Sequence, residues 1–256
     1  LLIMKIFNYI FIGLFGIFFS CAGSKVDDEI SLKEKFSSGL ENLEKEKYLQ
    51  AQSDFKYVVV RGTGSDLGDD AQYYLAESFY LNEEYLLSIA EYEKLTRRMA
   101  FSPFVEDARF KICEAYSIES PKYYHDQEYT EKALQRYQEF LDDFPNSKLI
   151  VDVVASIQLL REKLAIKLFE AGILYMKMDE YDSAKLIFQK VIDLYYDTEI
   201  IHKAYFEMLK ALAKNENIDE AISLLDQHQE ILVENNLYDD ANSLIQQIQR
   251  SMDNVK

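Results

Sequence analysis

From about residue 33 nearly to the end of the chain, apolar residues recur every three or four positions. That spacing places them on one face of an α-helix, so the pattern predicts a succession of amphipathic helices. A short polar stretch, residues 22–32, precedes the first of them. No segment shows the strict alternation of apolar and polar residues that indicates a half-buried β-strand.

The helical pattern is itself repeated. Tyr181, Ala184, Phe188 and Val191 place an aromatic, a small, a second aromatic and an apolar residue at fixed offsets. The same frame recurs around four further small residues: Ala51, Ser88, Ala133 and Ala221. Such a frame is typical of the second helix of a tetratricopeptide hairpin, in which the small residue lets two helices approach and the ring fills the space beside it.

First helices are predicted from small residues that lie 12 positions before three of these sites. The pairs are Gly39 with Ala51, Ala76 with Ser88, and Gly172 with Ala184. Two intervals of 37 residues separate Ala51 from Ser88 and Ala184 from Ala221, close to the ~34 of the tetratricopeptide repeat. The longer intervals predict an insertion around residues 119–127 and a long helix over about 149–178.

The sequence therefore predicts an all-α fold, a tetratricopeptide-repeat solenoid of about five helical hairpins with a C-terminal capping helix. The solenoid is expected to occupy residues 33–256. Its hairpins are predicted at residues 33–67, 68–104, 105–147, 149–198 and 200–235, and the cap at 237–253.

The beginning of the chain has the layout of a bacterial lipoprotein leader. Lys5 precedes an apolar run over residues 6–19, and the run ends at Ser20-Cys21. We expect residues 1–20 to be a signal peptide, with translation starting at Leu1 or Met4, and residues 21–32 to be a lipidated Cys21 and its tether. Several acyl chains on one residue give stable membrane attachment. The alternative is an uncleaved N-terminal segment with an incidental cysteine.

Composition narrows the function classes. With 8 Gly and 3 Pro in 256 residues, turns are too sparse for an all-β or alternating βα protein. The formal charge of −17 disfavours contact with phosphate backbones, so no nucleic-acid partner is expected. A solvated acidic surface explains most of this charge.

A solenoid exposes a concave surface lined by its first helices, and the repeat frame predicts which residues face it. The predicted peptide-binding groove comprises Phe36, Leu40, Leu43, Tyr73, Glu77, Tyr80, Phe110 and Glu114. Aromatic rings beside carboxylates suit an extended, partly aromatic peptide. The alternative is that these rings pack against the neighbouring hairpin.

Signals of catalysis are missing from the sequence. The histidines His125, His202 and His228 are far apart and belong to no metal-ligand pattern. There is no glycine-rich phosphate loop or nucleophile elbow. Cys113 lies one repeat after Ala76, which indicates packing in the core. We expect no enzyme, no metal and no cofactor.

One stretch of the third hairpin resembles a particular family of tetratricopeptide proteins. Asp126-Gln127, Thr130 and Ala133, followed by Phe144-Pro145-Asn146-Ser147, resemble the corresponding stretch of the BamD family. This is the tetratricopeptide lipoprotein family of the machine that assembles outer-membrane β-barrels. The resemblance extends from Cys21 to the final helix.

The resemblance implies a location and partners. It places the protein on the periplasmic face of the outer membrane, held by a lipid anchor, with other assembly lipoproteins and unfolded outer-membrane proteins as partners. Hairpins four and five, about residues 165–235, would dock on a BamA-like β-barrel protein. Hairpins one and two, about residues 33–101, would receive the unfolded substrates.

One position departs from the family pattern. Family members often carry an arginine just before the ring residue of the fourth hairpin, where this chain has Ile187. Docking would then use Ile187 itself, or Lys185 or Lys190 nearby. Two alternative functions remain open at this point. One is a general periplasmic tetratricopeptide lipoprotein that scaffolds cell-wall synthesis or division complexes, and the other is an enzyme with an unrecognised site.

Overall fold

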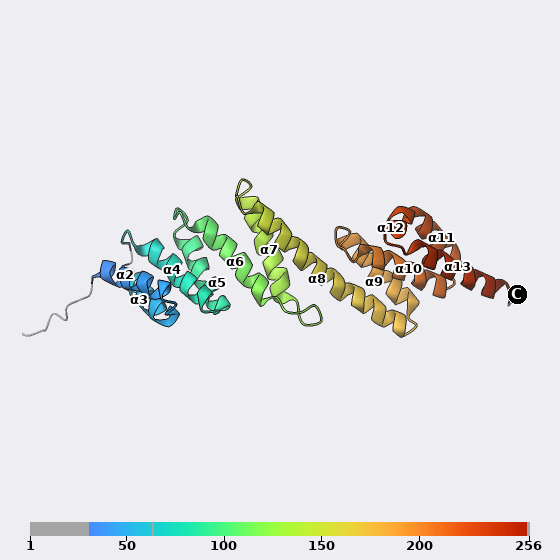
Figure 1. Ribbon diagram of the computed structural model, residues 1–256, viewed down its shortest axis with the longest axis horizontal. Helices are drawn as coiled ribbons and strands as arrows, with labels where there is room; N and C mark the ends of the chain where they lie inside the picture. Colours follow the sequence, from blue (N-terminus) through green and yellow to red (C-terminus); the bar gives the residue numbers. More distant parts are fainter. Residues whose placement is uncertain (1–30, 63, 255–256) are drawn as a thin grey trace, which may run out of the picture.

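A computed structural model describes residues 31–62 and 64–254 of the chain. Across these two ranges the regular structure is entirely α-helical. The helices follow one another along an elongated rod (Figure 1), with the N-terminal helices at one end and the C-terminal helices at the other. The predicted signal peptide, Cys21 and the tether up to residue 30 lie outside the described residues.

Ten helices form five consecutive antiparallel pairs, and each helix packs on the next along the chain. The pairs are α2 (Leu32–Glu44) with α3 (Tyr48–Arg61), α4 (Gly68–Leu81) with α5 (Tyr85–Arg98), α6 (Val105–Glu119) with α7 (Glu128–Asp143), α8 (Ile150–Lys177) with α9 (Tyr181–Leu194), and α10 (Ile201–Lys214) with α11 (Ile218–Gln227). Four of the pairs lie within a predicted hairpin range, and the first begins at Leu32, one residue before its predicted range. The all-α solenoid predicted from the sequence is confirmed.

The C-terminal end differs from the expected single cap. The second helix of hairpin five ends at Gln227, and a short helix, α12 (Gln229–Glu234), precedes α13 (Tyr238–Asp253). Helix α13 has the second-helix frame, with Ala241 and Ile245 both buried, and it packs on α10 and α11. The cap is therefore the second helix of a sixth, shortened hairpin.

The turns inside the hairpins share a left-handed residue. The residues with positive φ, between 56° and 62°, are Glu46, Glu83, Asp179, Glu216 and Asn236. This backbone conformation ends many helices and usually selects glycine or asparagine. Four of the five positions hold acidic residues instead, which explains how the chain turns tightly with so few glycines.

Hairpin packing depends on the small residues that the repeat frame identifies. Ala51, Ala133, Ala184 and Ala221 are completely buried. A Cβ added to Gly172 would lie 2.5 Å from Cε1 of Phe188, and one added to Gly39 would lie 2.6 Å from Cε1 of Phe55. In hairpins one and four the ring of the second helix therefore rests directly on the backbone of the first helix.

The long helix α8 belongs to two cores. Val153 and Leu160 pack with the third hairpin, whereas Ala165, Phe169 and Met176 pack with the C-terminal helices. The boundary falls between Leu160 and Ala165. Helix α8 thus joins an N-terminal body of three hairpins to a C-terminal body.

A buried carboxylate fastens the first helix of the rod. Asp54 of α3 accepts hydrogen bonds from Lys35 Nζ at 2.7 Å, Ser38 Oγ at 2.7 Å and Asn42 Nδ2 at 3.0 Å, all on α2. Burial by itself would raise the pKa of Asp54, but these donors hold the pKa below its usual range.

Replacing Gly172 by alanine is expected to lower the free energy of unfolding by about 1–2 kcal/mol. Overpacking against the buried Phe188 costs about 1–3 kcal/mol and outweighs the gain of roughly 1 kcal/mol in helix propensity. Urea denaturation measures the change. The matched control is Gly68→Ala, where the added Cβ meets only the Gly62 carbonyl oxygen at 3.7 Å; a stabilised Gly172→Ala protein would contradict the packing argument.

Replacing Asp54 by alanine is expected to destabilise the protein by about 2 kcal/mol at neutral pH, because three partly buried donors lose their acceptor. The folded-state pKa of Asp54 lies below the unfolded-state pKa, so its stabilisation is present above the unfolded value and is lost as pH falls through the folded one. The gap between wild type and variant should therefore shrink below about pH 4. Thermal unfolding across pH tests this, with the exposed Glu41→Ala as a control expected to change little.

Candidate functional site

The groove residues predicted in the first hairpin contribute to its core. Phe36, Leu40 and Leu43 are half-buried and pack on the cluster of Ala51, Phe55 and Leu75. The ring of Phe36 meets the ring of Phe55 edge-on, with centroids 5.7 Å apart. Phe110 of the third hairpin behaves similarly and lies edge-on to Phe140 at 5.9 Å. These four side chains therefore offer a partner only their exposed edges.

The groove residues of the second and third hairpins come together as a row of tyrosines and carboxylates. The Tyr73 hydroxyl donates to Asp107, and the Tyr92 hydroxyl donates to Glu77. The third pair is Tyr80 with Glu114, 3.5 Å apart. Two of these contacts, from Tyr73 and Tyr80, join α4 to α6 and so fix the spacing of hairpins two and three, whereas the Tyr92–Glu77 contact joins the two helices of hairpin two.

The hydroxyls in this row stay protonated. Burial, with the neighbouring carboxylates adding to it, raises the pKa of Tyr73, Tyr80 and Tyr92 far above the usual range. Lys111 Nζ lies 4.5 Å from the ring centroid of Tyr80 and 3.1 Å from a carboxylate oxygen of Glu114. The row can therefore donate and accept hydrogen bonds, but it has no group suited to acid–base catalysis.

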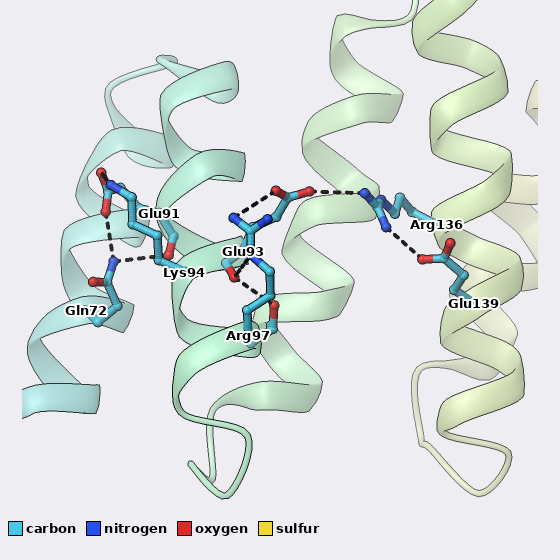
Figure 2. A network of polar contacts seen from close by, with 8 residues as sticks. Gln72, Glu91, Glu93, Lys94, Arg97, Arg136 and Glu139 are labelled. Carbon is cyan, nitrogen blue, oxygen red and sulfur yellow. Dashed lines mark hydrogen bonds and ion pairs between the residues drawn. The ribbon is translucent and has the colours of Figure 1, made fainter.

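A second polar network ties the second helices of neighbouring hairpins (Figure 2). Arg136 of α7 binds Glu93 of α5 at 3.1 Å and Glu139 of its own helix at 2.9 Å. The network borders a cavity of about 260 Å³ lined by Glu93, Thr96, Arg97, Arg109, Ile112 and Arg136. Because Arg97 and Arg109 also face carboxylates, 3.5 Å from Glu93 and 3.2 Å from Asp143, the network is best explained as a brace between hairpins.

A larger recess lies where the two bodies meet on α8. This junction groove, of about 680 Å³, is lined by Asp126, Gln127, Glu128, Glu131, Leu164, Lys167, Leu168, Ala171, Lys190, Leu194 and Tyr195. Helix α8 supplies an apolar floor, the start of α7 an acidic wall, and the end of α9 a wall of one lysine and two apolar residues. Such a recess suits an amphipathic segment of another polypeptide.

The acidic wall of this groove is held in place by buried polar contacts. Gln127 Nε2 donates to the carbonyl oxygens of Lys122 at 2.9 Å and His125 at 3.1 Å. Lys167 Nζ binds the His125 carbonyl oxygen at 2.8 Å, and Lys163 Nζ binds Ser120 Oγ at 2.7 Å. Two lysines of α8 thereby fix the inserted loop of hairpin three against the long helix.

The predicted docking residues on α9 do not share one surface. Lys190 lines the junction groove, whereas Lys185 faces α11 and lies 3.4 Å from Glu220. Ile187 is half-buried. Lys190 instead aligns with two exposed leucines, Leu186 and Leu194, which are 62% and 56% exposed. These three residues, four positions apart, form the α9 stripe.

Sequence reasoning missed Leu186 and Leu194, although their spacing was visible. The repeat frame assigns Ala184, Phe188 and Val191 to the core, so any further apolar residues at helical spacing must lie on another face. The acidic wall had no comparable signal, because residues 126–131 reach the groove only through the fold of the inserted loop.

The cysteine and histidine side chains outside these surfaces contribute to packing. Cys113 is buried, and burial raises its pKa to about 12, so its thiol is unreactive. The ring of His228 stacks on Tyr205 at 3.8 Å. Within residues 31–62 and 64–254, no cluster of three potential metal ligands occurs. No helix in the same ranges has the length and apolar character of a membrane span.

Sequence comparison places this architecture in a family. A profile of the YfiO family, described as outer membrane lipoprotein, matches residues 28–224. The outer membrane protein assembly factor BamD of Rickettsia prowazekii (strain Madrid E) is 25% identical over 200 residues, covering 75% of this chain and 77% of the relative.

Solved structures with a similar course include tetratricopeptide proteins. The TPR2AB domain of yeast Sti1, in its complex with pHSP90, is 14% identical with a TM-score of 0.47, covering 86% of this chain and 84% of that one. A tetratricopeptide protein of Thermus thermophilus is 16% identical with a TM-score of 0.36, covering 84% and 99%.

The family profile spans the helices from α2 to α10 and most of α11, and therefore both bodies of the rod and the junction groove between them. The match thus includes every surface described above, apart from the final short hairpin. This non-catalytic chain belongs to the YfiO (BamD) family of outer-membrane lipoproteins.

Proposed function

We propose that the protein is a scaffold and receptor in the assembly of outer-membrane β-barrel proteins. The family match over residues 28–224 carries this proposal. In it, the chain is attached to the periplasmic face of the outer membrane through lipid on Cys21. It docks on a BamA-like β-barrel protein, works beside other assembly lipoproteins, and receives unfolded outer-membrane proteins.

The C-terminal half supplies the docking surface. The α9 stripe exposes two leucines around Lys190 and continues into the junction groove, whose floor includes Leu164 and Leu168. Exposed apolar residues that adjoin a recess are typical of a protein interface, and the charged wall at residues 126–131 would set the orientation of the partner. Ile187 and Lys185 lie at the edge of this surface and contribute less.

The N-terminal hairpins supply a receptor surface of a different kind. Tyr73, Tyr80, Glu77 and Glu114 present ring edges and carboxylates that are already fixed by contacts within hairpin two and between hairpins two and three. A rigid surface of this kind binds an extended chain at a low cost in side-chain entropy. The apolar edges of Phe36, Leu40, Leu43 and Phe110 would extend the same surface on either side.

Replacing Leu194 by aspartate together with Lys190 by glutamate is expected to reduce recovery of the β-barrel partner at least tenfold, equivalent to about 1.4 kcal/mol. Affinity purification from detergent-solubilised envelope with quantitative mass spectrometry measures the recovery. The matched control is Leu49→Asp with Lys56→Glu on α3, since Leu49 is 64% exposed and the charge change is the same. Equal losses in both variants would contradict docking at α9.

The same affinity purification, carried out with the wild-type protein, also distinguishes β-barrel assembly from the alternative function of a general cell-envelope scaffold. Co-purification of a large β-barrel protein with repeated periplasmic domains supports the proposal. Recovery of only peptidoglycan-synthesis or division proteins would instead assign the chain to general cell-envelope scaffolding.

Replacing Cys21 by serine is expected to abolish metabolic incorporation of labelled palmitate and to release the chain from the membrane fraction, because the sulfur that carries diacylglycerol is gone. Replacing Cys113 by serine tests the other cysteine and should leave the label unchanged. Persistent labelling of the Cys21→Ser protein would refute the lipid attachment.

A further inference from the structure

The rod has two distinct edges. Because the helices of each hairpin are antiparallel, the loops between hairpins gather along one edge and the turns within hairpins along the other (Figure 1). We call the first the loop edge; it comprises the loops α3–α4, α5–α6, α7–α8 and α9–α10. A Cβ built on Gly62 would lie 3.2 Å from Leu32 Cδ1, so α2 begins beside the α3–α4 loop. The chain preceding residue 31 therefore joins the rod at the loop edge.

One loop on this edge carries a fully exposed aromatic ring. Phe101, in the α5–α6 loop, is 103% exposed, the highest value among the large apolar residues of the described chain. Scattered exposed apolar residues are common on soluble proteins, but a phenylalanine exposed to this extent leaves its whole side chain in water. Transfer of such a ring to an apolar environment is favourable by roughly 1.5–3 kcal/mol.

The end of α5 that leads into this loop is basic, although the protein as a whole is acidic. Residues 94–105 contain Lys94, Arg97 and Arg98 and no carboxylate, although the whole chain has a formal charge of −17. The other loops of this edge differ. The α3–α4 loop carries Asp66 and the α9–α10 loop carries Asp197 and Glu199. The α7–α8 loop has Lys148 but no exposed large apolar residue. The combination of cations with a free ring is therefore confined to the α5–α6 loop.

A ring flanked by arginines matches the chemistry of a phospholipid surface. Guanidinium groups bind lipid phosphates, and an aromatic ring partitions into the region between headgroups and acyl chains. A basic or neutral protein surface would gain little from Arg98. A lipid surface also needs no shape complementarity, which fits a single protruding ring with no recess around it.

The proposed tether is long enough to allow this contact. Ten peptide steps separate Cys21 from Ser31, and an extended chain covers at most about 33–36 Å over that length. Neighbouring helices pack about 8–10 Å apart, so the α5–α6 loop lies roughly 30 Å or less from the start of α2. A lipid on Cys21 could thus hold both the first hairpin and this loop at one surface.

We propose that the α5–α6 loop contacts the membrane, with Phe101 inserted at the headgroup level and the exposed Arg98 on a lipid phosphate. The contact would turn the loop edge of hairpins one and two toward the bilayer and leave the opposite edge facing the periplasm. The inference rests on the lipid attachment proposed above, but not on the identity of the protein partner.

The sequence offers a direct probe, because the chain contains no tryptophan. Phe101→Trp introduces a single indole at the loop tip. Tyr124→Trp is the matched control, since Tyr124 is 59% exposed and lies in the α6–α7 turn on the opposite edge. The full lipidated chain is reconstituted into vesicles of phosphatidylethanolamine and phosphatidylglycerol, with or without brominated acyl chains, and flotation confirms attachment.

The indole of Phe101→Trp is expected to shift to shorter emission wavelength in vesicles and to be quenched by brominated lipid at least roughly threefold more than that of Tyr124→Trp. Adding Arg98→Glu should reduce the quenching toward the control. Circular dichroism checks that each variant folds.

Three outcomes would overturn the contact. Equal quenching of the two indoles on chains that float would leave the scaffold proposal intact and remove the membrane loop. An emission shift that occurs only when the β-barrel partner is added would assign Phe101 to a protein interface. A chain that does not float at all would refute the lipid attachment on which the inference rests.

Discussion

The whole rod depends on one steric requirement: a bulky side chain on each second helix, an aromatic ring in hairpins one to four, must pack closely on its own first helix. Phe188 does so over Gly172, and Phe55 over Gly39, at distances that exclude a Cβ. Where the first helix has Ala76, the second supplies Tyr92, whose hydroxyl leaves the core to meet Glu77. The hairpin angle set by this contact is repeated along the chain and sets the curvature of the solenoid, and hence every surface on it.

A second consequence follows from the length of α8. Its 28 residues are about twice the length of the neighbouring helices, so α7 and α9 pack on different halves of it. The third and fourth hairpins consequently cannot nest as the others do, and the core divides between Leu160 and Ala165. The junction groove is the space left by this mismatch, and its walls come from both bodies.

The sequence was sufficient for the parts of the fold that depend on local spacing. Small and aromatic residues at fixed offsets predict which helices pair and where they begin and end. The sixth hairpin was missed because α12 is too short to show periodicity, although Tyr238, Ala241 and Ile245 repeat the frame.

The groove residues were harder to interpret, since periodicity cannot distinguish a ring that faces a ligand from one that, like Tyr73, stacks at 4.4 Å on Phe104 of the next hairpin. Contacts such as Arg136 with Glu93, 43 positions apart, have no signal in a single sequence.

The contacts between hairpins of the N-terminal body differ from those across the junction of the two bodies. This difference affects how binding at one body could change the orientation of the other. Within the first three hairpins, Gln52 reaches Glu84 at 2.7 Å and Arg136 reaches Glu93, so successive hairpins are tied through their second helices. Across the junction, loops make the ties: Arg161 holds Asp197 at 2.6 Å, and Lys167 holds the carbonyl of His125. Since surface ion pairs contribute little stability, the angle between the bodies is the least constrained part of the rod. A segment seated in the junction groove touches both walls and would fix that angle, so that docking at α9 would also set the orientation of the N-terminal hairpins.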